Sequence, residues 1–253
     1  MPTPPQVSDN PEVQSHYVTQ LALSTALLAA LRRLWPIVRP MDLAETFPAY
    51  RDATAAVVNK FSQASISLSG DYYEALRDDA GVTDPFRLPT IDPLSDEQIR
   101  AYLDTVVGDL ESPAEFMDEF AAGIQQKVEA ATQKVVADAG RSMVMGALQM
   151  DKTALGFARV AHPDACAFCL TLAMRGAVYK SRQTAGQIPP NTLGQVNRYH
   201  DNCGCGVQPL FVGDYELPDH VKAAQDLYNE ATAFTGPGEH VNAFRRALAA
   251  SRR

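Results

Sequence analysis

Four cysteines and one histidine have the types and spacing of metal ligands. Cys166 and Cys169 form a C-x-x-C pair, and His200, Cys203 and Cys205 follow after residues 170–199. The turn of a C-x-x-C pair brings both sulfurs to one side, and residues two apart on a strand face the same way. Because Zn²⁺ takes four tetrahedral N or S ligands, we predict one structural zinc site. Four thiolates, or three thiolates with His200, would complete it, and the sequence leaves that choice open.

The segment around these residues has reason to need a metal. Residues 154–216 contain few large apolar side chains, and residues 181–198 form a loop rich in Gly, Pro and Asn. Burial alone cannot easily offset the chain entropy of such a segment. A structural zinc contributes about 10–16 kcal/mol of apparent binding free energy in small zinc fingers, which would hold the loop at both ends.

Three other interpretations of the cysteines stay open. They are two disulfides, which the lack of a signal peptide disfavours; a redox C-x-x-C pair, which would normally lie in a βαβ pattern; and unrelated buried thiols. A thiolate-rich set with a spare ligand is typical of a closed structural site rather than a catalytic one. His162, just before the C-x-x-C pair, is interpreted as a loop histidine, with the metal shell as the alternative.

No enzyme motif stands out. The sequence has no H-E-x-x-H, G-x-S-x-G or Walker A pattern, and a trio such as Ser181, His200 and Asp201 is one of many that can be assembled on paper. We therefore expect no catalytic residues and no small-molecule substrate. Several cations near two tyrosines have the composition of a phosphate contact, although ordinary surface cations are the simpler interpretation: Arg175, Lys180, Arg182 and Arg198, beside Tyr179 and Tyr199.

The first half of the chain is expected to be helical. Asn10 followed by Pro11 predicts a helix start, and Pro36 and Pro40 predict its end near Trp35. Apolar residues at helical spacing continue over about 42–78, with Pro48 and Gly70 as expected breaks. Residues 79–94 contain three prolines and are interpreted as a connector.

Two further helices begin with capping boxes. Ser95 with Gln98 predicts a helix to about Leu110, and Ser112 with Glu115 predicts the next one. An apolar stripe from Phe116 to Met143 indicates that this last helix reaches Met150, about 55 Å at 1.5 Å per residue.

The pattern changes after residue 150. Short β-prone runs occur at 157–160, 177–180 and 207–212, and helical patterns return after Pro218 with a break at 236–238. The fold class is therefore mainly α: an N-terminal helical bundle with a long spine helix, followed by a small α+β zinc-stabilised lobe. The predicted divisions are a flexible tail (1–10), a helical domain (11–150), a zinc-binding α+β lobe (151–216) and C-terminal helices (217–253).

Charge is unevenly distributed. Residues 1–150 carry 21 acidic and 11 basic side chains, whereas residues 151–253 carry 9 and 11. This balance disfavours a nucleic-acid binder over the whole chain. Fourteen of the acidic residues lie within 71–120, either as solvated helix faces or as a docking face for a basic partner. Residues 17–31 lack charge but are too few to span a bilayer, and no basic residue precedes them, so we expect a cytoplasmic protein with no membrane association.

The segments ARVAHPDACAFCLTLAMRGAVYKS and RYHDNCGCGVQPLF resemble the Mu F-like minor head proteins of tailed phages, including those of actinobacterial phages. The resemblance covers roughly residues 155–212, and its motif consists of the five candidate ligands with Tyr199 and Pro209. It implies a head-morphogenesis protein that binds the portal and/or major capsid protein, in the host cytoplasm during assembly and then in the virion near the portal vertex. It also implies a role in DNA packaging or ejection, with phage DNA contacting the C-terminal lobe.

Two other functions are retained as alternatives. Some relatives are labelled capsid maturation proteases, although no protease motif here supports that label. A zinc-stabilised nucleic-acid-binding protein is the second alternative, with Arg175, Lys180 and Arg198 as its expected contacts.

Overall fold

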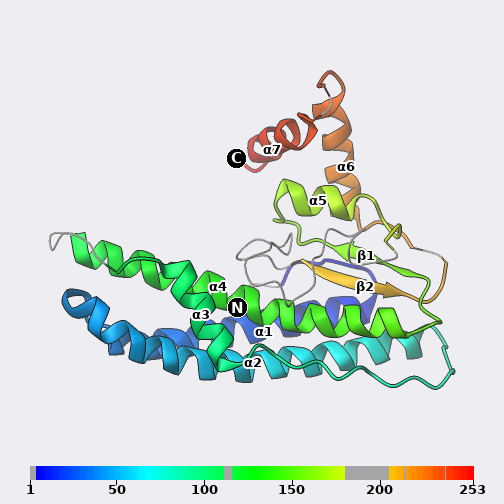
Figure 1. The fold of residues 1–253 in the computed structure, drawn as a ribbon. Coiled ribbons are helices and arrows are strands. Elements are labelled where there is room, and N and C mark those ends of the chain that lie inside the picture. Colours follow the sequence, from blue (N-terminus) through cyan, green and yellow to red (C-terminus); the bar gives the residue numbers. More distant parts are fainter. Residues whose placement is uncertain (1–3, 111–115, 180–204, 214, 237) are drawn as a thin grey trace.

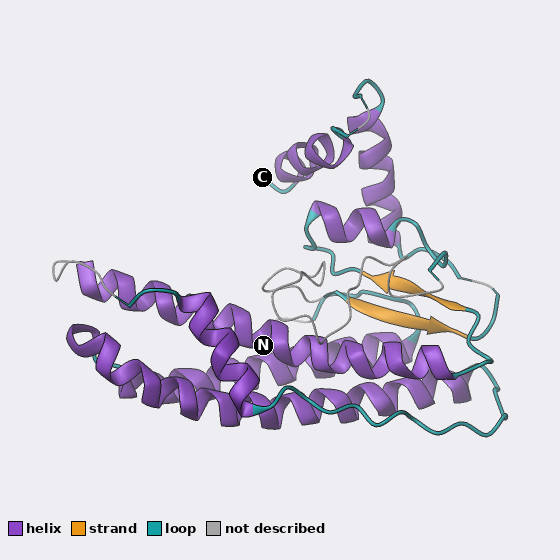
Figure 2. Ribbon diagram, viewed as in Figure 1, coloured by secondary structure: helices purple, strands orange, loops and turns teal. Residues whose placement is uncertain are grey.

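The computed structural model describes residues 4–110, 116–179, 205–213, 215–236 and 238–253. Its helices are α1 (Pro11–Leu34), α2 (Leu43–Asp79), α3 (Asp96–Val107), α4 (Met117–Met150), α5 (Ala167–Ala173), α6 (Asp219–Thr232) and α7 (His240–Ser251). Two short 3-10 turns, Trp35–Ile37 and Pro40–Asp42, join α1 to α2. Strands β1 (Gly156–Val160) and β2 (Gly206–Leu210) form an antiparallel pair in which Ala158 lies opposite Gln208. The protein is thus mainly helical with a small sheet, as predicted (Figure 2).

The long helices form an elongated layer, with the sheet and α5 above one half of it and α6 and α7 farthest away (Figure 1). Helices α2 and α4 run parallel: Ser65 lies beside Gly140, and Arg77 pairs with Asp151 farther along both helices. The connector and α3 carry the chain back so that α4 can start at the same end. Helix α1 runs antiparallel to both, since Gln20 bonds to Ser69 and Arg32 to Glu129.

Local signals set most helix ends. The side chain of Asn10 accepts hydrogen bonds from the N–H groups of Glu12 and Val13, and the Ser95–Gln98 capping box is present. Helix α4 ends at Met150, as predicted, while the predicted cap at Ser112 lies outside the described residues. Of the predicted β-prone runs, 157–160 and 207–212 overlap the two strands, each of which begins one residue earlier. The third run contributes a bridge between Tyr179 and Phe157.

One prediction about α2 was wrong. Neither Pro48 nor Gly70 breaks it, and the helix runs from Leu43 to Asp79. Pro48 lies near the N-terminal end, where its missing N–H costs one backbone hydrogen bond. At Gly70 a Cβ atom would lie 3.0 Å from Leu88 Cδ1, so glycine lets the connector pack closely. Packing against neighbouring helices therefore outweighs the low helix propensity of both residues.

Three buried clusters follow one another through the molecule. The first cluster joins the four helices α1, α2, α3 and α4 at the end of the layer where α2 and α4 begin. It lies around Leu31, Tyr50 and Ile124. The second joins α2 and α4 to the sheet and includes Val7, which is 1% exposed although it falls in the predicted tail. The third joins α5, α6 and α7. The second cluster crosses the predicted boundary at residue 150, and the four-part division of the chain stays a prediction.

Among the described helices, none is long and apolar enough by itself to cross a membrane. One bent pair, Pro11–Ile37 with Pro40–Asp79, passes that test only when the two are taken together.

Candidate metal centre

Three of the five predicted ligands come together in the structure. Cys166, Cys169 and Cys205 line one pocket of about 400 Å³ between the helical layer and the sheet. We call it the cysteine pocket. Its walls include residues of α1, α2 and α4, among them Tyr17 and Arg141. His200 and Cys203 lie outside the described residues. The chain thus brings cysteines from two distant stretches to the lining of one pocket.

Local backbone structure places the first cysteine pair. Cys166 is the N-cap of α5, and its Sγ accepts a hydrogen bond from the N–H of Cys169 at 3.5 Å. Cys169 is 1% exposed and Cys166 packs against the same buried cluster. The C-x-x-C spacing therefore corresponds to the first turn of a helix, with both sulfur-bearing residues at its start.

Arg141 of helix α4 binds the second cysteine-bearing stretch, which contains Cys205. Cys205, which is 3% exposed, directly precedes β2, and its carbonyl oxygen accepts bonds from Arg141 Nε at 3.0 Å and Nη2 at 2.8 Å. Asp138 in turn accepts from Arg141 Nη1 at 2.7 Å, one helical turn away. Cys205 is thus attached to the helical layer through its backbone carbonyl.

Sequence reasoning missed Arg141 and Asp138. Their spacing of three residues on a helix looks like an ordinary surface ion pair. Arg141 and Cys205 are 64 positions apart, so no local pattern relates them. Only the packing of β2 on α4 makes Arg141 part of the site.

Burial shapes the ionisation of the groups around the pocket. Burial, with the nearby Cys205 and Asp164, raises the pKa of Tyr17 to about 12. Burial also lowers the pKa of His162, and His220 and Arg252 lower it further against the opposing effect of Asp164. His162 lines the pocket, and its Nδ1 accepts a hydrogen bond from the N–H of Asp164 at 2.8 Å.

The donor set suits a soft divalent ion such as Zn²⁺, because thiolate sulfur is its preferred ligand. Within the described residues, no group of three His, Cys, Asp or Glu side chains is already arranged to hold a metal. Among those residues no disulfide joins the cysteines. Zinc binding by Cys166, Cys169 and Cys205, completed by Cys203 or His200, therefore stays a proposal.

The basic residues predicted as phosphate contacts are only partly described. The guanidinium of Arg175 lies 5.1 Å from the centre of the Tyr179 ring, in a contact within the chain. Lys180, Arg182 and Arg198 lie outside the described residues, as do Ser181 and Asp201. The nucleic-acid alternative and the Ser-His-Asp trio thus stay untested predictions.

Comparison with known proteins gives one match. The model of a family described as VG15 protein matches residues 7–231, which include all five predicted ligands. No curated protein and no solved structure matches the chain.

Proposed function

The chain belongs to the VG15 protein family, a family of phage proteins, and from that premise we propose that it is a minor capsid protein of head morphogenesis. In this role it associates with the portal and/or the major capsid protein and acts in head assembly, with DNA packaging or ejection as later steps. The observation that carries the proposal is the family match, which extends over both the helical layer and the cysteine pocket.

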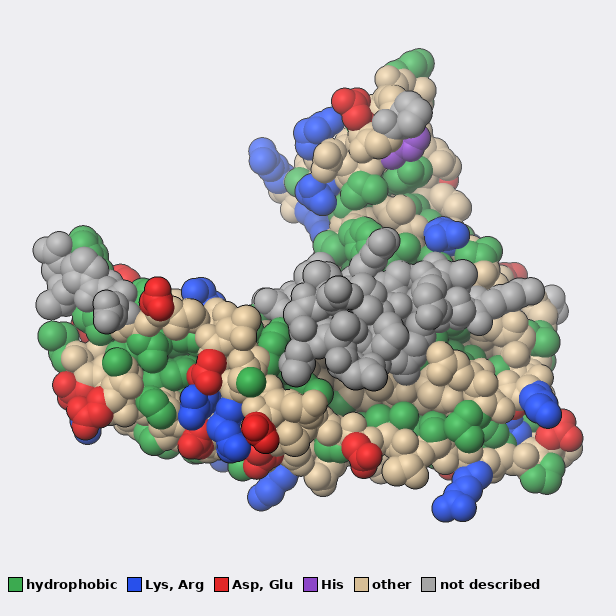
Figure 3. Space-filling view, viewed as in Figure 1, with side chains coloured by type: hydrophobic (Ala, Val, Ile, Leu, Met, Phe, Trp, Pro, Cys, Tyr) green, Lys and Arg blue, Asp and Glu red, His purple; other side chains and the backbone are tan. Residues whose placement is uncertain are grey.

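Shape and charge support a docking role. Helices α2 and α4 have 37 and 34 residues, and they offer a long rigid surface beneath the sheet (Figure 1). Acidic and basic side chains both lie on the visible face of the helical layer, whereas several Lys and Arg side chains lie around α7 (Figure 3). Residues 1–150 carry 21 acidic and 11 basic side chains, so an acidic body with a basic end would offer separate surfaces to partners of opposite charge.

We further propose that the cysteine pocket holds one structural Zn²⁺. When bound, the ion would supply a link between the two cysteine-bearing stretches. Cys166 and Cys169 are positioned by the start of α5, and Cys205 by Arg141 of α4. The role of these residues is to join the lobe to the helical layer.

Particle analysis tests the capsid proposal. Purified phage heads should contain this chain in far fewer copies than the major capsid protein, and electron microscopy should place it at the portal vertex. A chain that never co-purifies with heads or proheads would refute the proposal. Specific trimming of capsid or scaffold protein by the purified chain would instead favour the protease alternative, and salt-sensitive DNA binding would favour the nucleic-acid alternative.

Metal analysis tests the zinc proposal separately. The recombinant full-length chain should contain one zinc per molecule. Cys166→Ser, Cys169→Ser and Cys205→Ser should each lower that content strongly. Comparing Cys203→Ser with His200→Ala then identifies the fourth ligand. A folded protein that neither contains nor takes up zinc would exclude the site.

A further inference from the structure

Helix α7 lies beyond residue 231, where the family match ends, yet it forms part of the structure around the cysteines. Phe244 is fully buried, in the cluster that also contains Cys169 and Cys205, and Leu248 is 8% exposed in the same cluster. A buried aromatic side chain contributes strongly to packing. The α7 helix is therefore an integral wall of this cluster rather than an appendage.

Arg252, just after α7, reaches the segment that leads into the first cysteine. Its Nη2 donates hydrogen bonds to the carbonyl oxygens of Pro163 and Ala165, each at 2.9 Å. The Ala165 N–H also bonds to the carbonyl of His162 at 2.8 Å. One guanidinium nitrogen thus fixes two carbonyls of the turn immediately before Cys166.

Helix α6 holds the start of the same segment. His220 Nε2 lies 2.8 Å from the carbonyl oxygen of Ala161. We call residues 161–166 the cysteine loop. Its two ends are therefore attached to two successive helices, α6 through His220 and α7 through Arg252.

We propose that α6 and α7 act as a clamp on the cysteine loop, with Arg252 as a positioning residue for Cys166. This inference rests on the proposed metal site, since the loop is positioned for a ligand role. It adds that the site depends on an element beyond the family-matched region. Within the described residues, the hydrogen bonds of the Arg252 guanidinium go to backbone carbonyls, so Arg252 acts on the geometry of the loop.

A matched pair of arginine variants tests the clamp. Arg252→Ala removes the two bonds, while Arg253→Ala removes the same charge from a neighbouring exposed residue. In metal-free protein, alkylation of Cys166 with a thiol reagent, followed by peptide mass spectrometry, should be roughly three- to tenfold faster in Arg252→Ala than in wild type. Arg253→Ala should react like wild type. In zinc-loaded protein, zinc should transfer to a chromophoric chelator faster from Arg252→Ala than from wild type, and Arg253→Ala should again match wild type.

A second pair tests the packing side of the clamp. Phe244→Ala removes the buried ring, and Phe234→Ala removes a ring that is fully exposed. Phe244→Ala should speed alkylation of Cys166 and Cys169 more than Arg252→Ala does, with the helical content of the protein largely kept. Phe234→Ala should have no effect on either rate.

The two proposals fail in different ways. If wild type binds no zinc, the metal proposal falls, and the alkylation rates of the metal-free chain still decide the clamp. If zinc binds but Arg252→Ala and Phe244→Ala match their controls in both measurements, the clamp is overturned while the metal site stands.

Discussion

At the scale of single residues, a buried ion pair joins α2 to the end of α4. Arg77 and Asp151 have side chains 6% and 3% exposed, and they contact each other directly. Asp151 also accepts bonds from Tyr73 Oη at 3.1 Å and from the N–H and hydroxyl of Thr153 at 2.9 and 2.6 Å. Arg77 Nη2 donates to the carbonyl of Asp84 in the connector at 2.6 Å. Such a fully bonded network makes the loss of either partner costly.

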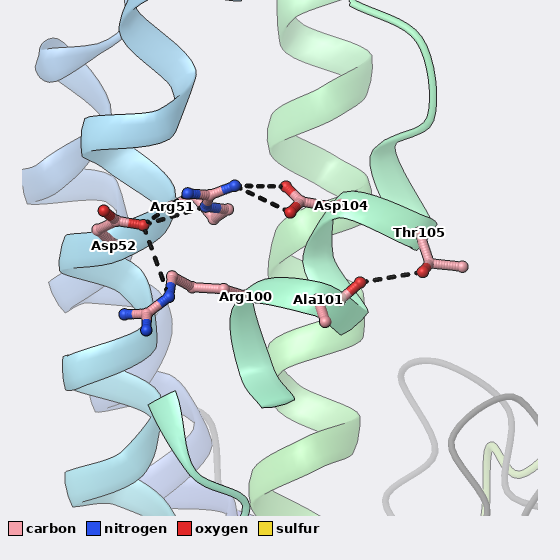
Figure 4. A network of polar contacts seen from close by, with 6 residues as sticks. All are labelled: Arg51, Asp52, Arg100, Ala101, Asp104 and Thr105. Atoms are coloured by element: carbon pink, nitrogen blue, oxygen red, sulfur yellow. Dashed lines mark hydrogen bonds and ion pairs between the residues drawn. The ribbon is translucent and has the colours of Figure 1, made fainter. Parts of the chain in front are cut away.

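We therefore predict that Asp151→Ala lowers the free energy of unfolding by about 3–5 kcal/mol, because it leaves a buried guanidinium without its counter-charge. Urea denaturation followed by circular dichroism measures this. The control is Asp104→Ala, which breaks the ion pair of Asp104 with Arg51 (Figure 4). The side chain of Arg51 is 23% exposed and that of Asp104 is 49% exposed. That change should cost about 0–1 kcal/mol. Equal losses in the two variants would contradict the prediction.

The same carboxylate gives stability a defined acid limit. Burial alone would raise the pKa of Asp151, but hydrogen bonds from Thr153, Arg77 and Tyr73 outweigh it, and the pKa falls below its ordinary value of 3.8. The unfolded chain therefore takes up the proton first as pH falls. The contribution of Asp151 is complete above its ordinary pKa and is lost as pH falls through the lowered one. The stability difference between wild type and Asp151→Ala should accordingly be constant from pH 5 to 7 and shrink below 3.8.

His16 should make the stability of the protein depend on pH in a range above that of Asp151. Its ring stacks on Tyr72, with centroids 4.1 Å apart, and burial lowers its pKa from 6.5 to about 4. Since the unfolded chain binds a proton below 6.5 and the folded chain does not, stability falls as pH drops from 6.5 toward 4. His16→Phe keeps a stacking ring without titration, so it should reduce that loss by about 1–3 kcal/mol. Urea curves at pH 7.5 and 5 measure the change, and an unaltered slope would show that His16 is not the group responsible.

At the scale of elements, the close approach of α2 and α4 depends on small side chains. A Cβ atom at Gly140 of α4 would lie 2.5 and 2.6 Å from the hydroxyl oxygens of Ser65 and Ser69. The same serines bond to Gln20 of α1, whose Oε1 accepts from Ser65 Oγ at 3.1 Å. This contact fixes the distance between three helices at one level, directly below the lobe that carries the cysteine pocket.

The same substitution at two glycines of α4 should have opposite effects. Gly140→Ala forces α2 and α4 apart and should destabilise the protein by about 1–3 kcal/mol. Gly123→Ala meets nothing within 4 Å and should stabilise it by about 0.5–1 kcal/mol through helix propensity. Thermal unfolding measures both changes, and a shared sign would contradict the helix-contact argument.

At the scale of the whole molecule, the first buried cluster contains no cysteine, whereas the third contains Cys169 and Cys205. Removing zinc with a chelator should therefore affect the two ends unequally. Hydrogen exchange of α5, β1 and β2 should speed by roughly a hundredfold relative to protein with free zinc at 100 times its dissociation constant. Exchange around Tyr50 and Ile124 should not change. Uniform acceleration over all helices would instead indicate one cooperative unit.

The sequence by itself determined the features that depend on near neighbours. Asn10, Ser95 and Pro36 act within one helical turn, so both ends of α1 and the start of α3 could be predicted, whereas α3 ends at Val107 and not near Leu110. The C-x-x-C pair could be recognised as a candidate ligand pair. The short β-prone runs at 157–160 and 207–212 likewise indicated both strands. The family-like motif around Cys166 and Cys205 pointed to a phage protein before any fold was known.

Tertiary structure decided what depends on residues far apart in the chain. Helix α2 continues past Pro48 and Gly70, because packing against the neighbouring helices outweighs the low helix propensity of these two residues. Tertiary structure also paired Arg77 with Asp151, Arg141 with Cys205, and Arg252 with the cysteine loop. Each of these is an arginine on a helix or directly after one, and in the sequence it looks solvent-facing. Its partner is a carboxylate or carbonyl that only the packing of distant segments brings within hydrogen-bonding distance, so no local pattern could have revealed it.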